Sequence, residues 1–196
     1  AKPKRGQHLR LDGLLDTRET AAAKFDGKDR EGAALRLESE CLPLMHSQWD
    51  RGPIRYHHAL GATILLGEYG DDEGRRGDET VVLLTKLEIE NTATTPQTAH
   101  VNLRFSHPAP ITLKEGGLIA IEPFGGNGPA GLTATRGMIS MGTPAGGGAA
   151  GWTVVPGRDE KASAVLSWSE PLEPGGRRTV YLKVPYVDLV DAAELK

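Results

Sequence analysis

Histidines are the residues of this 196-residue chain with the clearest capacity for chemistry, and their spacing limits what they can do. His57 and His58 are adjacent, so in a strand their side chains face opposite sides and cannot readily hold one metal ion together. His46 lacks a second ligand at a recognisable spacing, and Cys41 is the only cysteine, so no zinc-binding pattern can be assembled. One histidine of the adjacent pair is interpreted as a core or interface residue, with a contact to a sugar as the alternative. No metal and no cofactor is predicted.

Two loop sequences have the letters of binding motifs but lack the context that those motifs need. Gly126, Gly128 and Gly131 match a GxGxxG phosphate loop, yet β-like sequence follows where the mechanism requires a helix N-terminus. The acidic loop 67–79 lacks the alternating ligand spacing of a calcium-binding EF-hand and also contains two arginines. Both segments are interpreted as surface loops. No GxSxG nucleophile elbow occurs, and nothing selects a catalytic pair among the 26 acidic residues, so no catalytic residue is predicted.

Aromatic side chains near the ends of strand-like runs offer a second kind of site. Trp49 ends such a run before a turn, and Trp152 follows a glycine-rich loop. Aromatic faces at such edges can stack on sugar rings, which gives the candidate carbohydrate-binding set Trp49, Tyr56, His57 and Trp152. Ordinary packing is the favoured interpretation of the tryptophans, because large apolar residues are usually buried. Trp168, within an alternating strand pattern, is assigned to the core.

Composition argues against several classes of partner. The net charge of −3 and the pI near 6.1 provide no field that would attract nucleic acid or an anionic membrane. No apolar run approaches the roughly 20 residues of a membrane-spanning helix. With one cysteine the chain can form no internal disulfide, which fits either the cytoplasm or an exported protein, so the compartment stays open.

The elements that position these residues are predicted from residues 79–106. Two runs there alternate apolar and polar side chains, which indicates strands with one buried and one exposed face. In the first run the expected inward side chains are Val81, Leu83, Leu87 and Ile89, and the expected outward ones are Lys86, Glu88 and Glu90. A polar segment with turn chemistry from Asn91 and Pro96 joins the runs, so we predict a β-hairpin.

About ten such runs, separated by glycine and proline, predict an all-β fold: a two-layer antiparallel β-sandwich with at most one or two short helices. The sandwich is expected to span residues 33–187. Residues 1–32 are expected to form an N-terminal arm with a loop or a short helix near 17–25, and 188–196 to start a linker helix. Because the chain begins without methionine and ends in this helix-like segment, we expect it to be part of a longer polypeptide.

Three segments carry a resemblance to a known family. They are CLPLMHSQWDRGPIRYHHALGATIL, VVLLTKLEIENTATTPQTAHVNLRF and LEPGGRRTVYLKVPY. In this order they resemble the N-terminal, supersandwich-like β-sandwich of bacterial multidomain glycoside hydrolases and glycoside phosphorylases. In that family the sandwich precedes a helical (α/α)6 barrel, to which a linker helix connects it.

The resemblance implies a non-catalytic domain that packs against a catalytic helical barrel of the same polypeptide. The family's catalytic carboxylates lie in the barrel, so none is assigned to a residue here. Two other functions remain open. One is a stand-alone carbohydrate-binding or adhesion module that uses Trp49, Tyr56 and Trp152. The other is a sugar epimerase-like enzyme with a histidine and a carboxylate as acid and base.

Overall fold

The structure is a computed structural model, and it describes residues 15–16, 34–37, 44–64, 81–105, 111–121, 134–142, 151–159, 162–185 and 195. Several predictions concern segments outside these residues. They are the helix near 17–25, the loops 67–79 and 125–131, the surroundings of Cys41, and all of 188–196 except Leu195.

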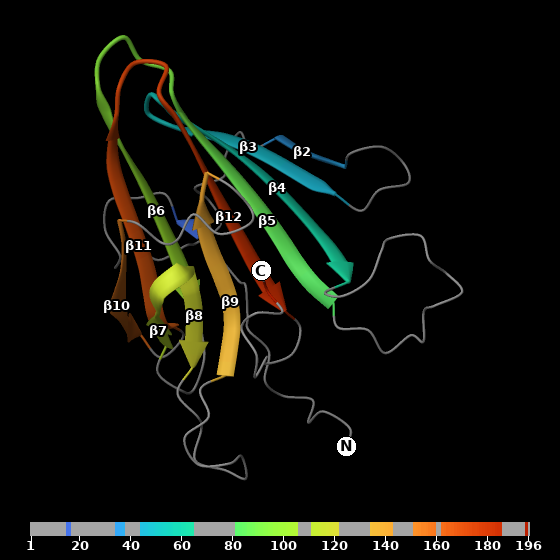
Figure 1. The fold of residues 1–196 in the computed structure, drawn as a ribbon. Coiled ribbons are helices and arrows are strands. Elements are labelled where there is room, and N and C mark those ends of the chain that lie inside the picture. The colour runs from blue at the N-terminus through green and yellow to red at the C-terminus, as the bar shows by residue number, and fades with distance from the viewer. Residues whose placement is uncertain are drawn as a thin grey trace.

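The described strands form two antiparallel sheets, which confirms the predicted all-β fold (Figure 1). The smaller sheet has the order β1 (Leu15–Asp16), β6 (Gln97–Phe105), β11 (Ala162–Leu172) and β10 (Trp152–Asp159). The larger has the order β2 (Ala34–Leu37), β3 (Met45–Arg51), β4 (Ile54–Ile64), β5 (Val81–Asn91), β12 (Arg177–Pro185), β9 (Ala134–Met141), β8 (Leu118–Ile121) and β7 (Ile111–Leu113). A 3-10 turn, η2 (Glu115–Gly117), precedes β8.

The predicted hairpin within residues 79–106 is wrong in its pairing. β5 pairs with β4 and β12 in the large sheet, whereas β6 pairs with β11 and β1 in the small one. The connection is therefore an arch between the two layers, and the buried faces of its strands look at each other across the core. Residues 173–176 form a second arch, from β11 to β12, because these strands also belong to different sheets.

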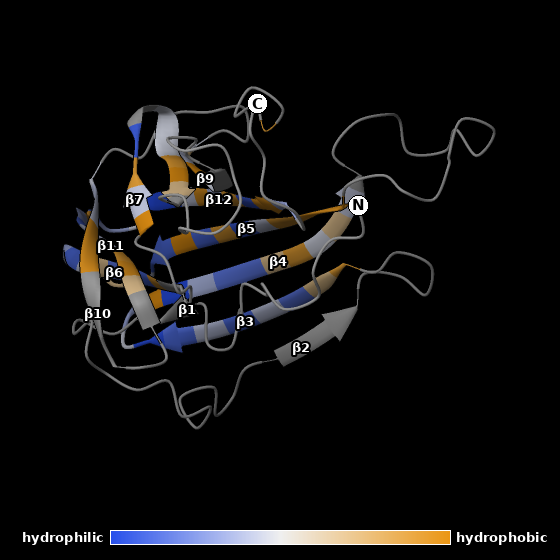
Figure 2. Cartoon of the chain, turned by 90° about the horizontal axis from the view of Figure 1, so that it is seen from below, coloured by the Kyte–Doolittle hydropathy of each residue, from blue (hydrophilic) through white to orange (hydrophobic). Residues whose placement is uncertain are grey.

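The two arches bond to each other at one end of the sandwich. The backbone N–H of Asn91 donates to the carbonyl of Gly176, and the N–H of Gly175 donates to the carbonyl of Asn91, each over 3.0 Å. From this end the two sheets diverge, so that β3, β4 and β5 extend away from the small sheet (Figures 1 and 2).

The core lies between the sheets and follows the predicted alternation along β5. Leu87 and Ile89 are fully buried, while the polar side chains between and beside them face outward with partial exposure. Val81, predicted to be buried, is 44% exposed because it lies at the far end of β5 from the arches. Tyr56 ties the layers together, since its hydroxyl donates to the backbone carbonyl of His100 on β6 over 3.1 Å.

Gly137 occupies a position in β9 where no larger residue fits. A Cβ atom there would lie 2.7 Å from the carbonyl oxygen of Lys183 on the neighbouring strand β12. We expect Gly137→Ala to lower the free energy of unfolding by about 1–3 kcal/mol, because backbone must shift to admit the methyl group. Urea denaturation measures the change. Gly175→Asn is the matched control, since no atom lies within 4 Å of its Cβ and asparagine tolerates its φ of +71°; an equal loss in both variants would contradict this account.

Candidate functional site

A line of four polar side chains crosses the outer face of the large sheet. Nδ1 of His46 lies 3.2 Å from Nε2 of His57, and Nδ1 of His57 lies 3.0 Å from Oε2 of Glu88. The other carboxylate oxygen of Glu88 is 2.9 Å from Nζ of Lys86. The side chains of His57 and Glu88 are 32% and 45% exposed, so the line is open to solvent. We call His46, His57, Glu88 and Lys86 the histidine–carboxylate line.

Strand register places these residues together. Gly52 and Pro53 form a two-residue loop that pairs Arg51 with Ile54, and Gly52 has the positive φ of +55° that such tight hairpin loops need. The register then sets Gln48 opposite His57, which makes His46 the diagonal neighbour of His57 on the same face. Along the next pair of strands, His57 stands directly opposite Glu88.

Electrostatics fix the roles of the charged members. The hydrogen bonds from Lys86 and then from His57 lower the pKa of Glu88, and the hydrogen bond to Glu88 raises the pKa of Lys86. Glu88 is thus a carboxylate at neutral pH and can only accept, so Nδ1 of His57 carries the proton that it donates to Glu88. In neutral His57 the other nitrogen, Nε2, is then an acceptor toward His46.

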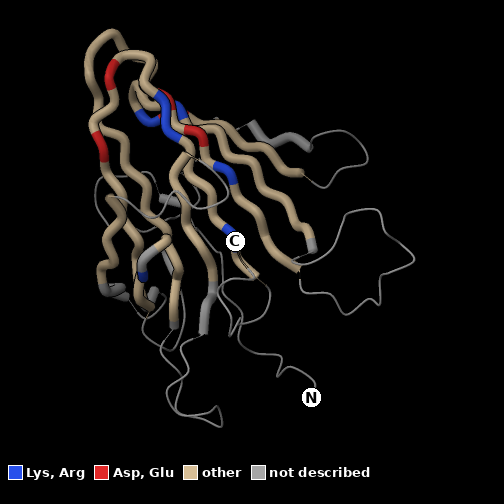
Figure 3. Tube along the Cα trace, viewed as in Figure 1, with Lys and Arg blue, Asp and Glu red and all other residues tan. Residues whose placement is uncertain are grey.

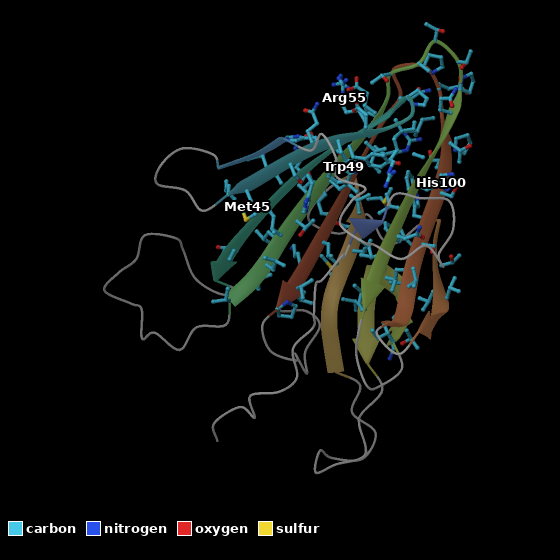
Figure 4. The ribbon with its side chains drawn as sticks, turned by 180° about the vertical axis from the view of Figure 1, so that it is seen from behind. Met45, Trp49, Arg55 and His100 are labelled. Atoms are coloured by element: carbon cyan, nitrogen blue, oxygen red, sulfur yellow. The ribbon has the colours of Figure 1, made fainter. Side chains whose placement is uncertain are left out.

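A second line of charges runs beside the first, nearer the arches. Asp50, Arg55, Glu90 and Arg177 are successive cross-strand partners on β3, β4, β5 and β12, so their charges alternate in sign. Arg55 bonds to Asp50 over 3.0 Å, and Arg177 bonds to Glu90 over 2.6 Å. Most charged residues of the described strands gather toward this end, where Arg55 projects (Figures 3 and 4). Exposed pairs of this kind contribute little stability, so the line mainly makes this part of the face polar.

The structure separates the four candidate carbohydrate-binding residues. Only His57 lies on the outer face, within the histidine–carboxylate line. Tyr56 is 1% and Trp152 7% exposed, so both rings belong to the core. Trp49 is partly buried and stacks on Tyr56 between the sheets, with ring centroids 5.4 Å apart. The packing interpretation is therefore confirmed for Trp152, which also packs against the core residue Trp168.

Sequence reasoning missed the partners of His57. His46 was dismissed because no second ligand stands near it in sequence, yet the hairpin brings it within 3.2 Å of His57. The two-residue loop could have predicted this contact, because once Arg51 pairs with Ile54 the register of every other pair in the hairpin is fixed. The prediction that His57 and His58 face opposite sides is confirmed. His57 lies on the outer face, whereas the ring of His58 packs edge-on against the inward-facing ring of Trp49, with the two ring centroids 6.5 Å apart.

Within the described part of the chain, no group of three or more histidine, cysteine, aspartate or glutamate side chains could hold a metal ion. The same residues include no helix that is long and apolar enough to cross a membrane.

No protein-family model matches the sequence, and a comparison with curated proteins finds no significant match. The histidine–carboxylate line offers the chemistry of two imidazoles, one carboxylate and one ammonium group on a part of the sheet that is open to solvent.

Proposed function

We propose that the chain is a non-catalytic β-sandwich domain of a carbohydrate-active enzyme, a glycoside hydrolase or phosphorylase, and that it packs against a helical catalytic domain of the same polypeptide. The resemblance of its three strand segments to such sandwiches supports the proposal, as does the two-layer fold. The contact surface would be the outer face of the large sheet where β8, β9 and β12 lie.

The observation that carries the proposal is the place of Leu195. Its side chain is 1% exposed and packs with Met138 of β9 and Leu118 of β8, which turn away from the main core. Nζ of Lys183 on β12 donates to the carbonyl of Leu195 over 2.9 Å, and burial lowers the pKa of this lysine. Leu195 thus lies against the outer face of the large sheet, which is where a following domain would make its first contact.

Comparison of the 196-residue chain with its complete natural gene product tests this proposal. We expect the chain alone to release no product from a panel of aryl glycosides, with or without phosphate, and the complete protein to be active. Leu195→Asp should lower the stability of the complete protein, because it places a charge in an apolar contact. Thr98→Asp, at an exposed position of the small sheet, is the matched control. Hydrolysis by the chain alone, or a gene product that lacks a helical domain, would refute the proposal.

A second candidate function is favoured by the contact between His57 and Glu88. This pair supplies the histidine and carboxylate that a sugar epimerase-like enzyme would use as acid and base. Incubation of the chain with a panel of aldoses distinguishes this candidate, because turnover abolished by His57→Ala would support it and no turnover by the wild type would remove it. The stand-alone carbohydrate-binding alternative keeps only Trp49 of its three aromatic residues, since Tyr56 and Trp152 are buried.

A further inference from the structure

The distance between the facing ring nitrogens of His46 and His57 matches the distance between two nitrogen ligands of one metal ion. Their facing nitrogens, Nδ1 and Nε2, are 3.2 Å apart. Two imidazole nitrogens bound to one tetrahedral zinc ion at 2.0–2.1 Å are separated by about 3.3 Å. The two rings are nearly parallel, with an interplanar angle of 15° and centroids 5.4 Å apart, and their facing nitrogens lie on the outer face of the sheet.

Glu88 prepares His57 for this role. Metal-bound histidines commonly donate their second ring N–H to a carboxylate, which fixes the tautomer and raises the basicity of the ligating nitrogen. The contact of 3.0 Å between His57 Nδ1 and Glu88 Oε2 has this arrangement and leaves the lone pair of Nε2 directed at His46. Lys86 holds Glu88 from the other side and restrains the carboxylate.

We propose that His46 and His57 form a binding site for a divalent transition-metal ion, with Glu88 as the positioning residue of His57. Since Nε2 of His57 accepts, Nδ1 of His46 must carry the proton of the hydrogen bond between the two rings. A bound ion takes the place of that proton, and neutral His46 changes to the tautomer with its proton on Nε2. Two imidazoles suit Zn²⁺ and bind Cu²⁺ more tightly. Water can reach the remaining coordination positions, because the side chains of His57 and Glu88 are open to solvent.

The sheet makes the pair rigid enough to act as a chelate. β3 and β4 pair without interruption from Met45 and Leu60 to Arg51 and Ile54, so both histidines stand on a continuous antiparallel ladder. The site involves β3, β4 and β5, whereas Leu195 occupies the face of β8 and β9. It is thus independent of the proposed contact with a helical domain and can be tested on the 196-residue chain.

Titration calorimetry of the tag-free chain with ZnCl₂ and with CuCl₂ tests the proposal, with MgCl₂ as a control ion. We expect one bound ion per chain, tighter for Cu²⁺ than for Zn²⁺, and no binding of Mg²⁺. His46→Ala and His57→Ala should each weaken binding by well over tenfold, and Glu88→Gln by a smaller factor of about tenfold. His100→Ala removes one imidazole from β6 in the other sheet and should leave the affinity unchanged.

Two further measurements separate loss of the metal ligands from loss of the fold. Circular dichroism establishes that each variant is folded, and electron paramagnetic resonance of the Cu²⁺ complex should show two nitrogen ligands in the wild type and one in His46→Ala. No binding to the wild type, or equal affinity in the wild type and both histidine variants, would overturn the proposal. Loss of binding in His100→Ala but not in His46→Ala would place the ion elsewhere and would overturn it as well.

Discussion

Replacing Asn91 should destabilise this protein more than any other single substitution considered for it. Its side chain is fully buried at the end of β5, where Nδ2 donates to the carbonyls of Leu172 and Thr95 over 2.8 and 2.9 Å. Oδ1 accepts the N–H of Ala93 over 2.9 Å. One carboxamide therefore serves both arches, since Leu172 ends β11 and Thr95 lies in the connection to β6. We expect Asn91→Ala to lower the free energy of unfolding by about 3–4 kcal/mol, because three polar groups lose their partner at once.

Asn91→Asp is the more discriminating variant, because it keeps the shape and the acceptor but loses both donated hydrogen bonds. At neutral pH its carboxylate would face two carbonyl oxygens, so we expect a loss larger than that of Asn91→Ala. Burial raises the pKa of such a carboxyl, and the protonated form can again donate one hydrogen bond. The part of the stability that this bond supplies is therefore present below the unfolded pKa of about 3.9 and is lost as pH rises through the folded pKa.

Urea denaturation at pH 7 and at pH 4 measures both effects. Gln97→Ala is the matched control, because its side chain donates to Thr95 at an exposed position of the same connection and should matter by less than about 0.5 kcal/mol. An Asn91→Ala protein as stable as Gln97→Ala would contradict the role assigned to the carboxamide. So would an Asn91→Asp protein whose difference from the wild type is the same at both pH values.

Asn91 also shows which part of the fold the sequence could predict. Alternation along β5 identified its inward side chains, because Leu87 and Ile89 need only a strand with one covered face. Alternation does not distinguish a hairpin from an arch, since both place one face of each strand in the core. The distinction depends on which partner satisfies the backbone at the turn. Here that partner is a second arch, which lies more than 80 residues away in sequence at Gly175 and Gly176.

The candidate site also has contacts that the sequence could predict and contacts that it could not. The proximity of His46 to His57, as diagonal neighbours, follows from the two-residue loop at Gly52 and Pro53, so the sequence could have predicted it. The position of Glu88 was not, because the loop between β4 and β5 is long and does not fix the register in which His57 meets it. The burial of Trp152 was predicted from the size of its side chain, but its partner was not, because the pairing of β10 with β11 sets Trp152 directly opposite Trp168.

Alkaline pH should expose the role of Tyr56. Its ring is 1% exposed, and this burial raises the pKa of the phenol to about 12, while the contact of its hydroxyl with the backbone of His100 acts in the opposite direction. The folded protein then keeps the phenol proton at pH values where the unfolded chain, with a tyrosine pKa near 10, releases it. Stability from this group is fully present below pH 10 and falls as pH rises toward 12. The loss amounts to about 3 kcal/mol, since each pKa unit corresponds to about 1.4 kcal/mol.

Tyr56→Phe isolates this effect because the other titrating groups are the same in both proteins. At pH 8 we expect the variant to be less stable by about 1 kcal/mol, the usual contribution of one hydrogen bond. Between pH 10 and 12 its stability should fall less steeply, so the two curves of unfolding free energy against pH should cross. Urea denaturation across this range provides the curves. Tyr181→Phe, on the outer face, retains Tyr56 and should follow the wild type. Parallel curves for Tyr56→Phe and the wild type would mean that the phenol ionises equally in the folded and unfolded states, which would contradict its burial between the sheets.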